Sequence, residues 1–267
     1  MGSDGETSLV ATKLRPPTPP GRLVDRTRLS DTLDAAAADP TVRVVLVSAP
    51  AGSGKSTMVA SWQRRRSGGA WVQADASDHD PARFWGYVVG ALADGVPGVE
   101  AAARPAVSAA GTDAGPLVER IANELAASAP VTLVIDDYHL VGNSKIDEAL
   151  ERLIELAPEG FLLVLGTRVD PGLRLSRLRV RSQLVEIRAD RLRFDVGETH
   201  LLLDGRHLTE EQTASLCTRT EGWAAGLVLA GLSLDRSDDH DRFVEAFQGD
   251  DRLVVDYLTE EYLAGVG

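Results

Sequence analysis

A short apolar run that leads straight into a glycine-rich turn constrains this chain more than any other feature. The run covers residues 42–48, and the turn over residues 49–57 reads Ala-Pro-Ala-Gly-Ser-Gly-Lys-Ser-Thr. A helical pattern begins at Lys55 and continues toward Arg66. Strand, glycine-rich loop and helix N-terminus in this order are typical of a phosphate-binding P-loop.

The residues of this turn suit phosphate for separate physical reasons. Gly52 and Gly54 let backbone N–H groups approach phosphate oxygens, because no Cβ stands in the way. Lys55 can reach the β- and γ-phosphates, and the Ser56 hydroxyl is placed to ligate Mg²⁺. We expect the phosphate cradle to comprise Ala51, Gly52, Ser53, Gly54, Lys55, Ser56 and Thr57. Ala49 replaces the first glycine of the usual motif, and the alternative is a turn of this shape without a ligand.

A second apolar run ends in two carboxylates. Residues 131–135 form a continuous β-branched and apolar stretch, as expected of a strand buried on both faces, and Asp136 and Asp137 follow it. In P-loop proteins an aspartate at this place belongs to the Mg²⁺ shell, which predicts that role for Asp136. Asp137 could orient or deprotonate the attacking water, and its alternative is a helix cap or a surface charge.

A third apolar run, residues 161–167, ends at Arg168. An arginine at the carboxyl edge of a parallel sheet faces the crevice where ligands bind, so Arg168 could sense or stabilise a γ-phosphate. The alternative is a surface arginine, since residues 174–193 are rich in arginine. That basic segment could contact nucleic acid. Because acidic residues interleave and Phe194 is the nearest aromatic, we favour solvated faces and contacts between domains.

Composition and charge restrict the class of protein. The chain has 267 residues, 43% hydrophobic and 25% charged, with a net charge of −12. This charge argues against non-specific binding of nucleic acid, which needs a basic surface. A lone cysteine, Cys217, cannot form an intrachain disulfide or a metal site. The N-terminus lacks the pattern of a signal peptide, and no stretch approaches a membrane span of about 18 apolar residues, so we expect a cytoplasmic protein.

The order of the elements predicts an α/β fold. We expect a three-layer P-loop NTPase sandwich with a mainly parallel sheet, followed by a small helical domain, since the pattern changes to helices only after Asp195. Residues 209–212 form a capping box, and residues 221–230 a small-residue helix. The expected domains are an extended segment (1–22), the P-loop domain (23–193), a helical lid (194–235) and the start of a further helical or winged-helix domain (236–267).

Three segments are distinctive together: residues 48–57 followed by Trp62, residues 133–140 and residues 221–227. Residues 13–17, 23–26, 178–184, 191–194 and 256–261 add to them. In this order they resemble the signal-transduction ATPases with numerous domains (STAND). Among these, they are most similar to the nucleotide-binding region of the large LuxR-type, maltose-regulator-like transcriptional regulators. The resemblance covers nearly the whole chain.

The resemblance implies a molecular switch that binds ATP or ADP with Mg²⁺. ADP would hold a closed resting state, an inducer and ATP would open it, and the active form would self-associate. Hydrolysis would be slow and would reset the switch. Val24 and Arg26 would lie near the adenine, Arg168 near the γ-phosphate, and the turn of Gly222 and Trp223 would close over the base. The alternative for Arg26 is a solvated charge at a helix start.

Members of this family continue into a winged-helix piece, a helical sensor and a C-terminal helix-turn-helix. The resemblance therefore implies that this chain is the nucleotide-binding part of a larger regulator, or a truncated relative of such regulators. A small-molecule or protein inducer and DNA would then bind to parts that the chain does not contain. Two rival functions stay open: a working P-loop enzyme, such as a kinase or remodelling ATPase, and a nucleotide-binding interaction module that never hydrolyses.

Overall fold

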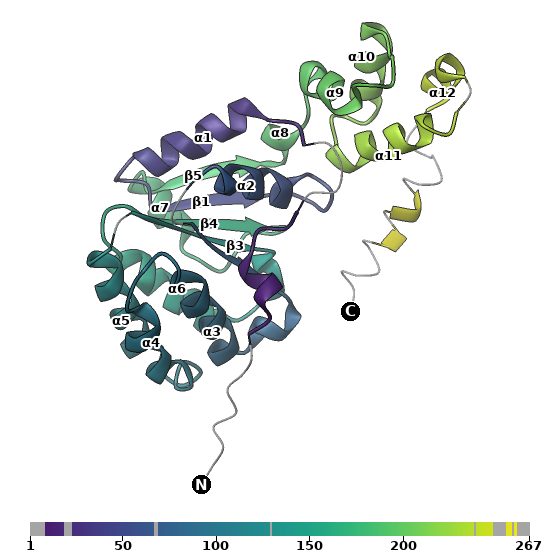
Figure 1. Ribbon diagram of the computed structural model, residues 1–267. Coiled ribbons are helices and arrows are strands. Elements are labelled where there is room, and N and C mark those ends of the chain that lie inside the picture. Colours follow the sequence, from purple (N-terminus) through teal and green to yellow (C-terminus); the bar gives the residue numbers. More distant parts are fainter. Residues whose placement is uncertain are drawn as a thin grey trace. The chain divides into compact units, whose positions relative to one another are not determined.

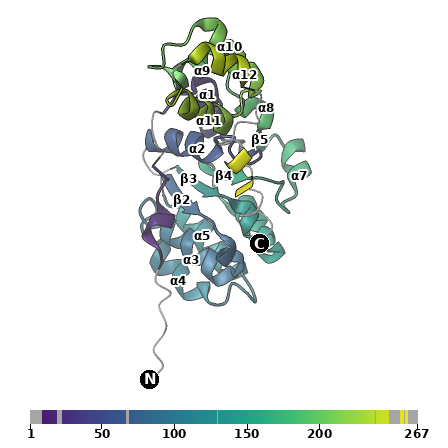
Figure 2. The same cartoon turned by 90° about the vertical axis from the view of Figure 1, so that its right-hand side faces the viewer.

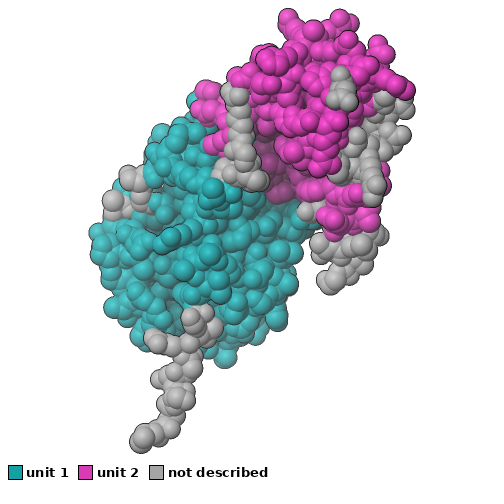
Figure 3. All heavy atoms as spheres, turned by 45° about the vertical axis from the view of Figure 1, so that its right-hand side comes forward, with its two compact units in different colours: residues 1–18, 30–48, 56–188 teal, residues 19–29, 49–55, 189–267 magenta. Residues whose placement is uncertain are grey.

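The computed structural model describes residues 9–18, 23–66, 69–128, 130–237, 239–247, 255–257 and 259–260. They form two compact units, coloured separately in Figure 3. Unit 1 contains the described parts of residues 1–18, 30–48 and 56–188, and unit 2 those of residues 19–29, 49–55 and 189–267. The glycine-rich turn therefore groups with the helices of the second half of the chain rather than with the sheet.

Unit 1 is built on five parallel strands: β1 (Val44–Ser48), β2 (Gly69–Gln73), β3 (Val131–Asp136), β4 (Phe161–Thr167) and β5 (Leu184–Arg188). Their spatial order is β2-β3-β4-β1-β5, so β4 lies between β3 and β1. The register places Ser48 beside Thr167 and Gln73 beside Asp136. The carboxyl ends of the strands therefore meet at one edge, and the predicted parallel sheet is confirmed.

Helices cover both faces of this sheet, which is why its strands are apolar along their length. Figures 1 and 2 show α1 (Thr27–Ala38) and α2 (Lys55–Arg64) on one side. On the other side lie α3 (Pro81–Leu92), α4 (Val99–Val107), α5 (Gly115–Ala126) and α6 (Ser144–Leu156). Leu46, Leu133 and Leu163 belong to the core shared with α3–α6. The expected three-layer sandwich is confirmed.

The helix boundaries follow local signals where those are strong. Asp80 caps α3 by accepting a hydrogen bond from the backbone N–H of Arg83, and Pro81 is the first helical residue, a combination that favours a helix start. The short helix α7 (Leu175–Val180), by contrast, lies in the arginine-rich segment and was not predicted. A helix of six residues is too short to be predicted from the spacing of its apolar residues. Short 3₁₀ turns occupy Ala11–Leu14, Ala76–His79 and Tyr138–Leu140.

Unit 2 contains the helices α8 (Ala189–Leu192), α9 (Val196–Leu203), α10 (Glu210–Arg219), α11 (Ala224–Leu234) and α12 (His240–Ala246). Leu216, Leu227 and Leu234 lie in its core. The predicted capping box of α10 is confirmed. Helix α11 starts three residues later than predicted, because Glu221 and Gly222 have φ values of 50° and 67°. Of the further domain expected over residues 236–267, residues 238, 248–254, 258 and 261–267 lie outside the described residues.

Candidate functional site

The glycine-rich turn in unit 2 has the backbone geometry of an anion cradle. Gly52 and Gly54 have φ values of 69° and 80°, and such left-handed residues within a turn direct successive N–H groups inward. Lys55 is only 6% exposed, and its Nζ donates to the carbonyl oxygens of Ala49 (2.8 Å) and Pro50 (2.9 Å). The ammonium group is therefore held inside the turn, where helix α2 begins.

The start of helix α11 is hydrogen-bonded to the same turn. The indole Nε1 of Trp223 donates to the carbonyl oxygen of Ala51 (3.2 Å), and the backbone N–H of Ala225 donates to that of Gly52 (2.9 Å). A Cβ on Gly52 would lie 2.7 Å from the Cβ of Ala225 and 2.8 Å from the Trp223 ring. Glycine at position 52 therefore allows both the left-handed turn and the close approach of α11.

A hollow of about 210 Å³ lies between the turn and the residues that precede α11. Pro50 and Ser53 line it from the turn, and Gly222 and Trp223 line it from the opposite side. Arg193 and Leu192 complete a wall that is part polar and part apolar. The structure thus brings the Gly222–Trp223 pair next to the part of the glycine-rich turn that lies in unit 2.

Arg26 lies in the same unit and is buried rather than solvated. It is 6% exposed, and its Nε and Nη2 donate to one carboxylate oxygen of Glu198 at 3.1 and 3.0 Å. Its Nη2 also donates to the carbonyl oxygen of Arg193, and its guanidinium lies over the Phe194 ring. Burial lowers the pKa of Arg26. The solvated alternative is wrong: Arg26 fastens its segment, which includes half-buried Val24, to helix α9.

Asp136 ends strand β3 in unit 1, with its carboxylate against the backbone of β4. It is 2% exposed, and a Cβ on Gly166 would come within 2.2 Å of Asp136 Oδ1. Glycine at position 166 therefore makes room for this carboxylate. Because β4 separates β3 from β1, the carboxylate lies over the strand next to the one that leads into the turn.

Asp137 adopts an unusual backbone conformation directly after β3. Its φ is 53° and its ψ 34°, a left-handed geometry that residues with a Cβ rarely adopt. It precedes the 3₁₀ turn Tyr138–Leu140, but its side chain accepts no cap hydrogen bond. Instead it accepts a 2.8 Å hydrogen bond from Nε2 of Gln73, and His139 Nδ1 lies 4.0 Å away. Gln73 was not among the predicted site residues, although its place at the end of a neighbouring strand was a signal in the sequence.

Arg168 directly follows β4 and is half-buried. A group of charges that the sequence did not predict lies on the same edge of the sheet. Arg188, at the end of β5, donates to Asp170 Oδ2 (3.0 Å) and to Glu186 Oε1 (3.0 Å), and the Ser48 hydroxyl donates to Asp170. Hydrogen bonds from Arg188 lower the pKa of the Asp170 carboxyl. This network fixes the loop after β4 beside the end of β1.

The oxygen donors of the predicted metal site suit Mg²⁺. In phosphate-dependent sites this ion takes one or two protein oxygens and completes its shell with phosphate and water. The Ser56 hydroxyl and the Asp136 carboxylate are donors of this kind. Across the described part of the chain, no three His, Cys, Asp or Glu side chains group in a way that could hold a metal, which rules out a multi-carboxylate cage there.

Residues 18–165, more than half of the chain, match the family described as the AAA ATPase domain. The chain belongs to this family. The P-loop, strands β1, β2 and β3 and the aspartates at the end of β3 lie within the matched residues, and this membership implies nucleotide binding.

Two curated relatives extend the similarity of this AAA ATPase domain over nearly the whole chain. The serine/threonine-protein kinase PknK of Mycobacterium tuberculosis is 33% identical over 262 residues, which are 95% of this chain and 23% of PknK. The HTH-type transcriptional regulator MalT of Serratia proteamaculans is 34% identical over 267 residues, 96% of this chain and 29% of MalT. The resemblance to the maltose regulators is thus confirmed. The chain spans about a quarter of the length of these relatives.

Among solved structures, the Walker-type ATPase PABY2304 of Pyrococcus abyssi has a similar fold. It superposes with a TM-score of 0.57 over 94% of this chain and 77% of its own, at 12% sequence identity. This likeness supports the P-loop ATPase fold. Within the described residues, no helix has the length and apolar character that a membrane crossing requires.

Proposed function

We propose that this AAA ATPase domain is the nucleotide switch of a transcriptional regulator of the STAND class. ADP bound to the P-loop would hold the resting state, and exchange for ATP would produce an active state that self-associates. The inducer and DNA would act through other parts of a larger protein, as in a regulator like MalT. We also expect the protein to be cytoplasmic.

The observation that carries this proposal is the direct bonding between the phosphate cradle and helix α11. Trp223 and Ala225 donate to the carbonyl oxygens of Ala51 and Gly52, the residues that must orient N–H groups toward a phosphate. A change in the peptide planes of the cradle would change the acceptors that α11 uses. Occupancy of the cradle would therefore be transmitted to helix α11, as a switch requires and a simple phosphate site does not.

The hollow beside the turn could hold the base or the ribose of the nucleotide. Its volume of about 210 Å³ and its lining by Trp223, Leu192 and Arg193 suit a planar base or a ribose. We propose that the Gly222–Trp223 turn covers this part of the nucleotide. Val24 and Arg26 would contribute by shaping the same unit, with Arg26 acting through Glu198 and the backbone of Arg193.

We assign the chemistry of slow hydrolysis to five side chains. Lys55 would contact the β- and γ-phosphates, and Ser56 and Asp136 would supply the protein oxygens for Mg²⁺. Asp137, held by Gln73, would orient the attacking water, and Arg168 would sense the γ-phosphate. Thr57 would complete the cradle beside Ser56.

Nucleotide content and turnover of the purified protein test this function. The protein is denatured, the released nucleotide is separated and identified, and phosphate release is measured separately at saturating Mg-ATP. The switch predicts bound ADP and a turnover well below the ~1–100 s⁻¹ of kinases. Turnover in that range without any inducer would contradict a switch and favour a working enzyme. Bound ATP without any hydrolysis would favour the interaction module.

A further inference from the structure

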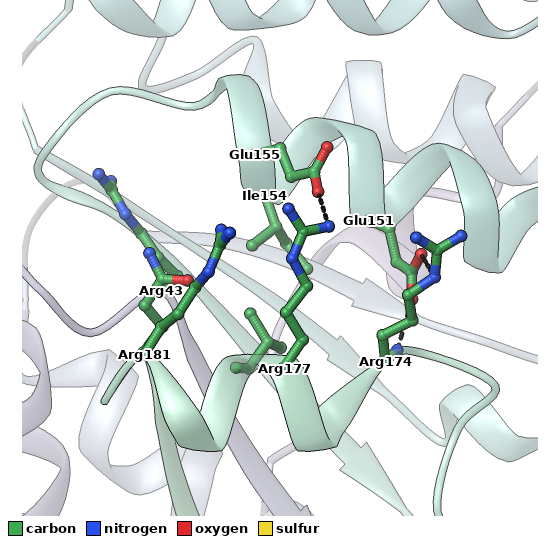
Figure 4. A pocket seen from close by; sticks show the side chains of 9 residues that line it. Arg43, Glu151, Ile154, Glu155, Arg174, Arg177 and Arg181 are labelled. Atoms are coloured by element: carbon green, nitrogen blue, oxygen red, sulfur yellow. Dashed lines mark hydrogen bonds and ion pairs between the residues drawn. The ribbon is translucent and has the colours of Figure 1, made fainter.

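Unit 1 carries a groove of about 220 Å³ between helices α6 and α7, and Figure 4 shows the side chains that line it. Arginines dominate its wall. The charged residues are Arg43, Arg174, Arg177, Arg181, Glu151 and Glu155. This is a local excess of positive charge on a chain whose net charge is −12.

Three of the arginines form a stripe on α7. Arg177 lies within α7, and Arg174 and Arg181 are the residues directly before and after this helix. Figure 4 shows all three extending side by side toward α6. Arg174 Nε lies 3.2 Å from Glu151, and Arg177 Nη1 lies 2.5 Å from Glu155. The first two guanidinium groups therefore have carboxylate partners on α6.

The third arginine of the stripe has no such partner. Among the described residues, exposed Arg181 forms no ion pair. Arg43 lies at the same end of the groove, since its backbone N–H donates to the carbonyl oxygen of Gln183 (2.9 Å). The Arg43 guanidinium donates to a neutral acceptor, the carbonyl oxygen of Pro158. This end of the groove thus has two guanidinium groups with donors available for an anion.

The groove is separate from the phosphate cradle. Arg43 immediately precedes β1, whereas the cradle follows Ser48 at the other end of that strand. Five strand residues span about 16 Å. The arginines at the amino end of β1 therefore have a role other than holding the nucleotide phosphates.

The chemistry of the groove favours a peptide over a polyphosphate chain. Glu151 and Glu155 would repel a run of phosphates. Single carboxylates, by contrast, can bind Arg43 and Arg181, the two arginines of the groove that have no carboxylate partner in the described part of the chain. The floor contains Ile154, which is 5% exposed, and half-buried Leu178, so it also offers an apolar contact. A volume of about 220 Å³ is large enough for individual side chains of a peptide.

We propose that this groove docks an acidic peptide segment of a partner protein. Carboxylates of the segment would bind Arg43 and Arg181, and an aliphatic side chain between them would contact Ile154 and Leu178. Bidentate pairing of guanidinium with carboxylate would supply both affinity and orientation. The basic groove on an acidic protein would direct the segment to this one face.

Fluorescence anisotropy tests the proposal on the whole chain. The probe is a short fluorescein-labelled peptide in which single glutamates alternate with leucine. Loss of one charge-assisted hydrogen bond corresponds to roughly a tenfold loss of affinity or more. We therefore expect Arg181→Glu, at an exposed position, and Arg43→Gln each to weaken binding at least about tenfold. Arg104→Glu, an equal charge change on α4, should leave binding within about twofold.

Other outcomes would overturn the proposal. One is a wild-type protein that does not bind the peptide, and another is binding that neither groove substitution affects. Tighter binding of a single-stranded oligothymidine, lost in Arg181→Glu, would assign the groove to nucleic acid. Self-association of the wild-type protein that Arg181→Glu abolishes, without peptide binding, would assign it to a second copy of the chain.

Discussion

At the scale of single residues, a buried lysine fixes the N-terminal segment to unit 1. Lys13 donates to Asp75 (3.0 Å) and to fully buried Asp78, and its ammonium lies 4.2 Å from the centre of the Tyr87 ring. Arg83 also pairs with Asp78. The motif resemblance drew attention to residues 13–17, but only the structure shows that Lys13 neutralises a buried carboxylate.

Replacing this lysine should destabilise unit 1. Lys13→Met removes the charge while keeping much of the apolar stem, and leaves Asp78 buried with one partner fewer. Breaking a buried ion pair costs about 3–5 kcal/mol, so we expect the free energy of unfolding to fall by roughly 3 kcal/mol. Urea denaturation followed by circular dichroism measures this. Arg104→Ala, which removes an exposed pair with Glu100, should cost less than about 1 kcal/mol. Equal losses for the two variants would contradict this explanation.

Asp137 is the residue whose predicted role depends most on local geometry. Its left-handed backbone and its hydrogen bond from Gln73 hold the carboxylate in one place. If it orients the attacking water, Asp137→Asn should retain ATP binding and lose hydrolysis by a factor of about 10²–10⁴. Gln73→Ala should reduce hydrolysis less and leave ATP affinity unchanged. Phosphate release and equilibrium binding measure the two quantities.

A matched control uses a carboxylate away from the sheet edge. Asp94→Asn changes an exposed residue that follows α3 and should alter neither hydrolysis nor binding. If Asp137→Asn hydrolyses ATP at the wild-type rate, Asp137 has a structural role and does not orient the water.

At the scale of secondary-structure elements, a charge network joins α7, β5 and the loop after β4. Glu186 accepts hydrogen bonds from Arg179 at 2.7 and 3.0 Å and from Arg188 at 3.0 Å. These bonds, with Arg179 first, lower the pKa of Glu186 to about 2, from an ordinary value near 4.5. A lowered carboxyl pKa in the folded state stabilises the protein above the unfolded pKa.

This stabilisation should disappear as the pH falls from about 4.5 toward about 2, because Glu186 then takes up its proton. Glu186→Gln removes the titrating group. We therefore expect the wild-type protein to be the more stable at about pH 6, and the difference between the two to shrink through this window. Urea midpoints at a series of pH values measure the difference. A constant difference down to about pH 2.5 would show that the pKa of Glu186 is not shifted by the network.

The contact between α11 and the phosphate cradle gives a spectroscopic prediction. Three of the four tryptophans, Trp62, Trp71 and Trp85, are at most 1% exposed in unit 1, whereas Trp223 is half-buried and bonded to Ala51. Nucleotide binding should therefore change the fluorescence of Trp223 in particular. We expect ADP to alter the emission of the wild-type protein and of Trp71→Phe, and Trp223→Phe to lose that change. If Trp223→Phe shows the full fluorescence change on ADP binding, nucleotide binding is not coupled to Trp223.

The same element shows what the sequence could and could not predict. The small residues after Trp223 indicated a closely packed helix, and residue spacing located that helix to within three positions. The bonding of Trp223 and Ala225 to Ala51 and Gly52 joins residues about 170 positions apart in the chain. No local pattern encodes such a pairing. Only the resemblance predicted that Gly222 and Trp223 lie near the nucleotide.

At the scale of the whole molecule, the α/β architecture was predictable because three strands, β1, β3 and β4, are largely apolar runs that lead into characteristic polar residues. Asp136 and Arg168 marked the carboxyl edge of the sheet in this way. The division into two units was harder to predict from the sequence. The cradle groups with the helices through tertiary contacts, so the predicted boundaries at residues 22, 193 and 235 remain predictions.

The central prediction concerns nucleotide binding at the glycine-rich turn. The most direct measurement is isothermal titration of Mg-ADP and Mg-ATP into the wild-type protein, Lys55→Ala and the control Lys145→Ala, which changes an exposed lysine of α6. We expect the wild-type protein and Lys145→Ala to bind both nucleotides, and Lys55→Ala to remain folded and lose most of its affinity for both. If folded Lys55→Ala binds ATP as tightly as the wild-type protein, the turn is not the phosphate site.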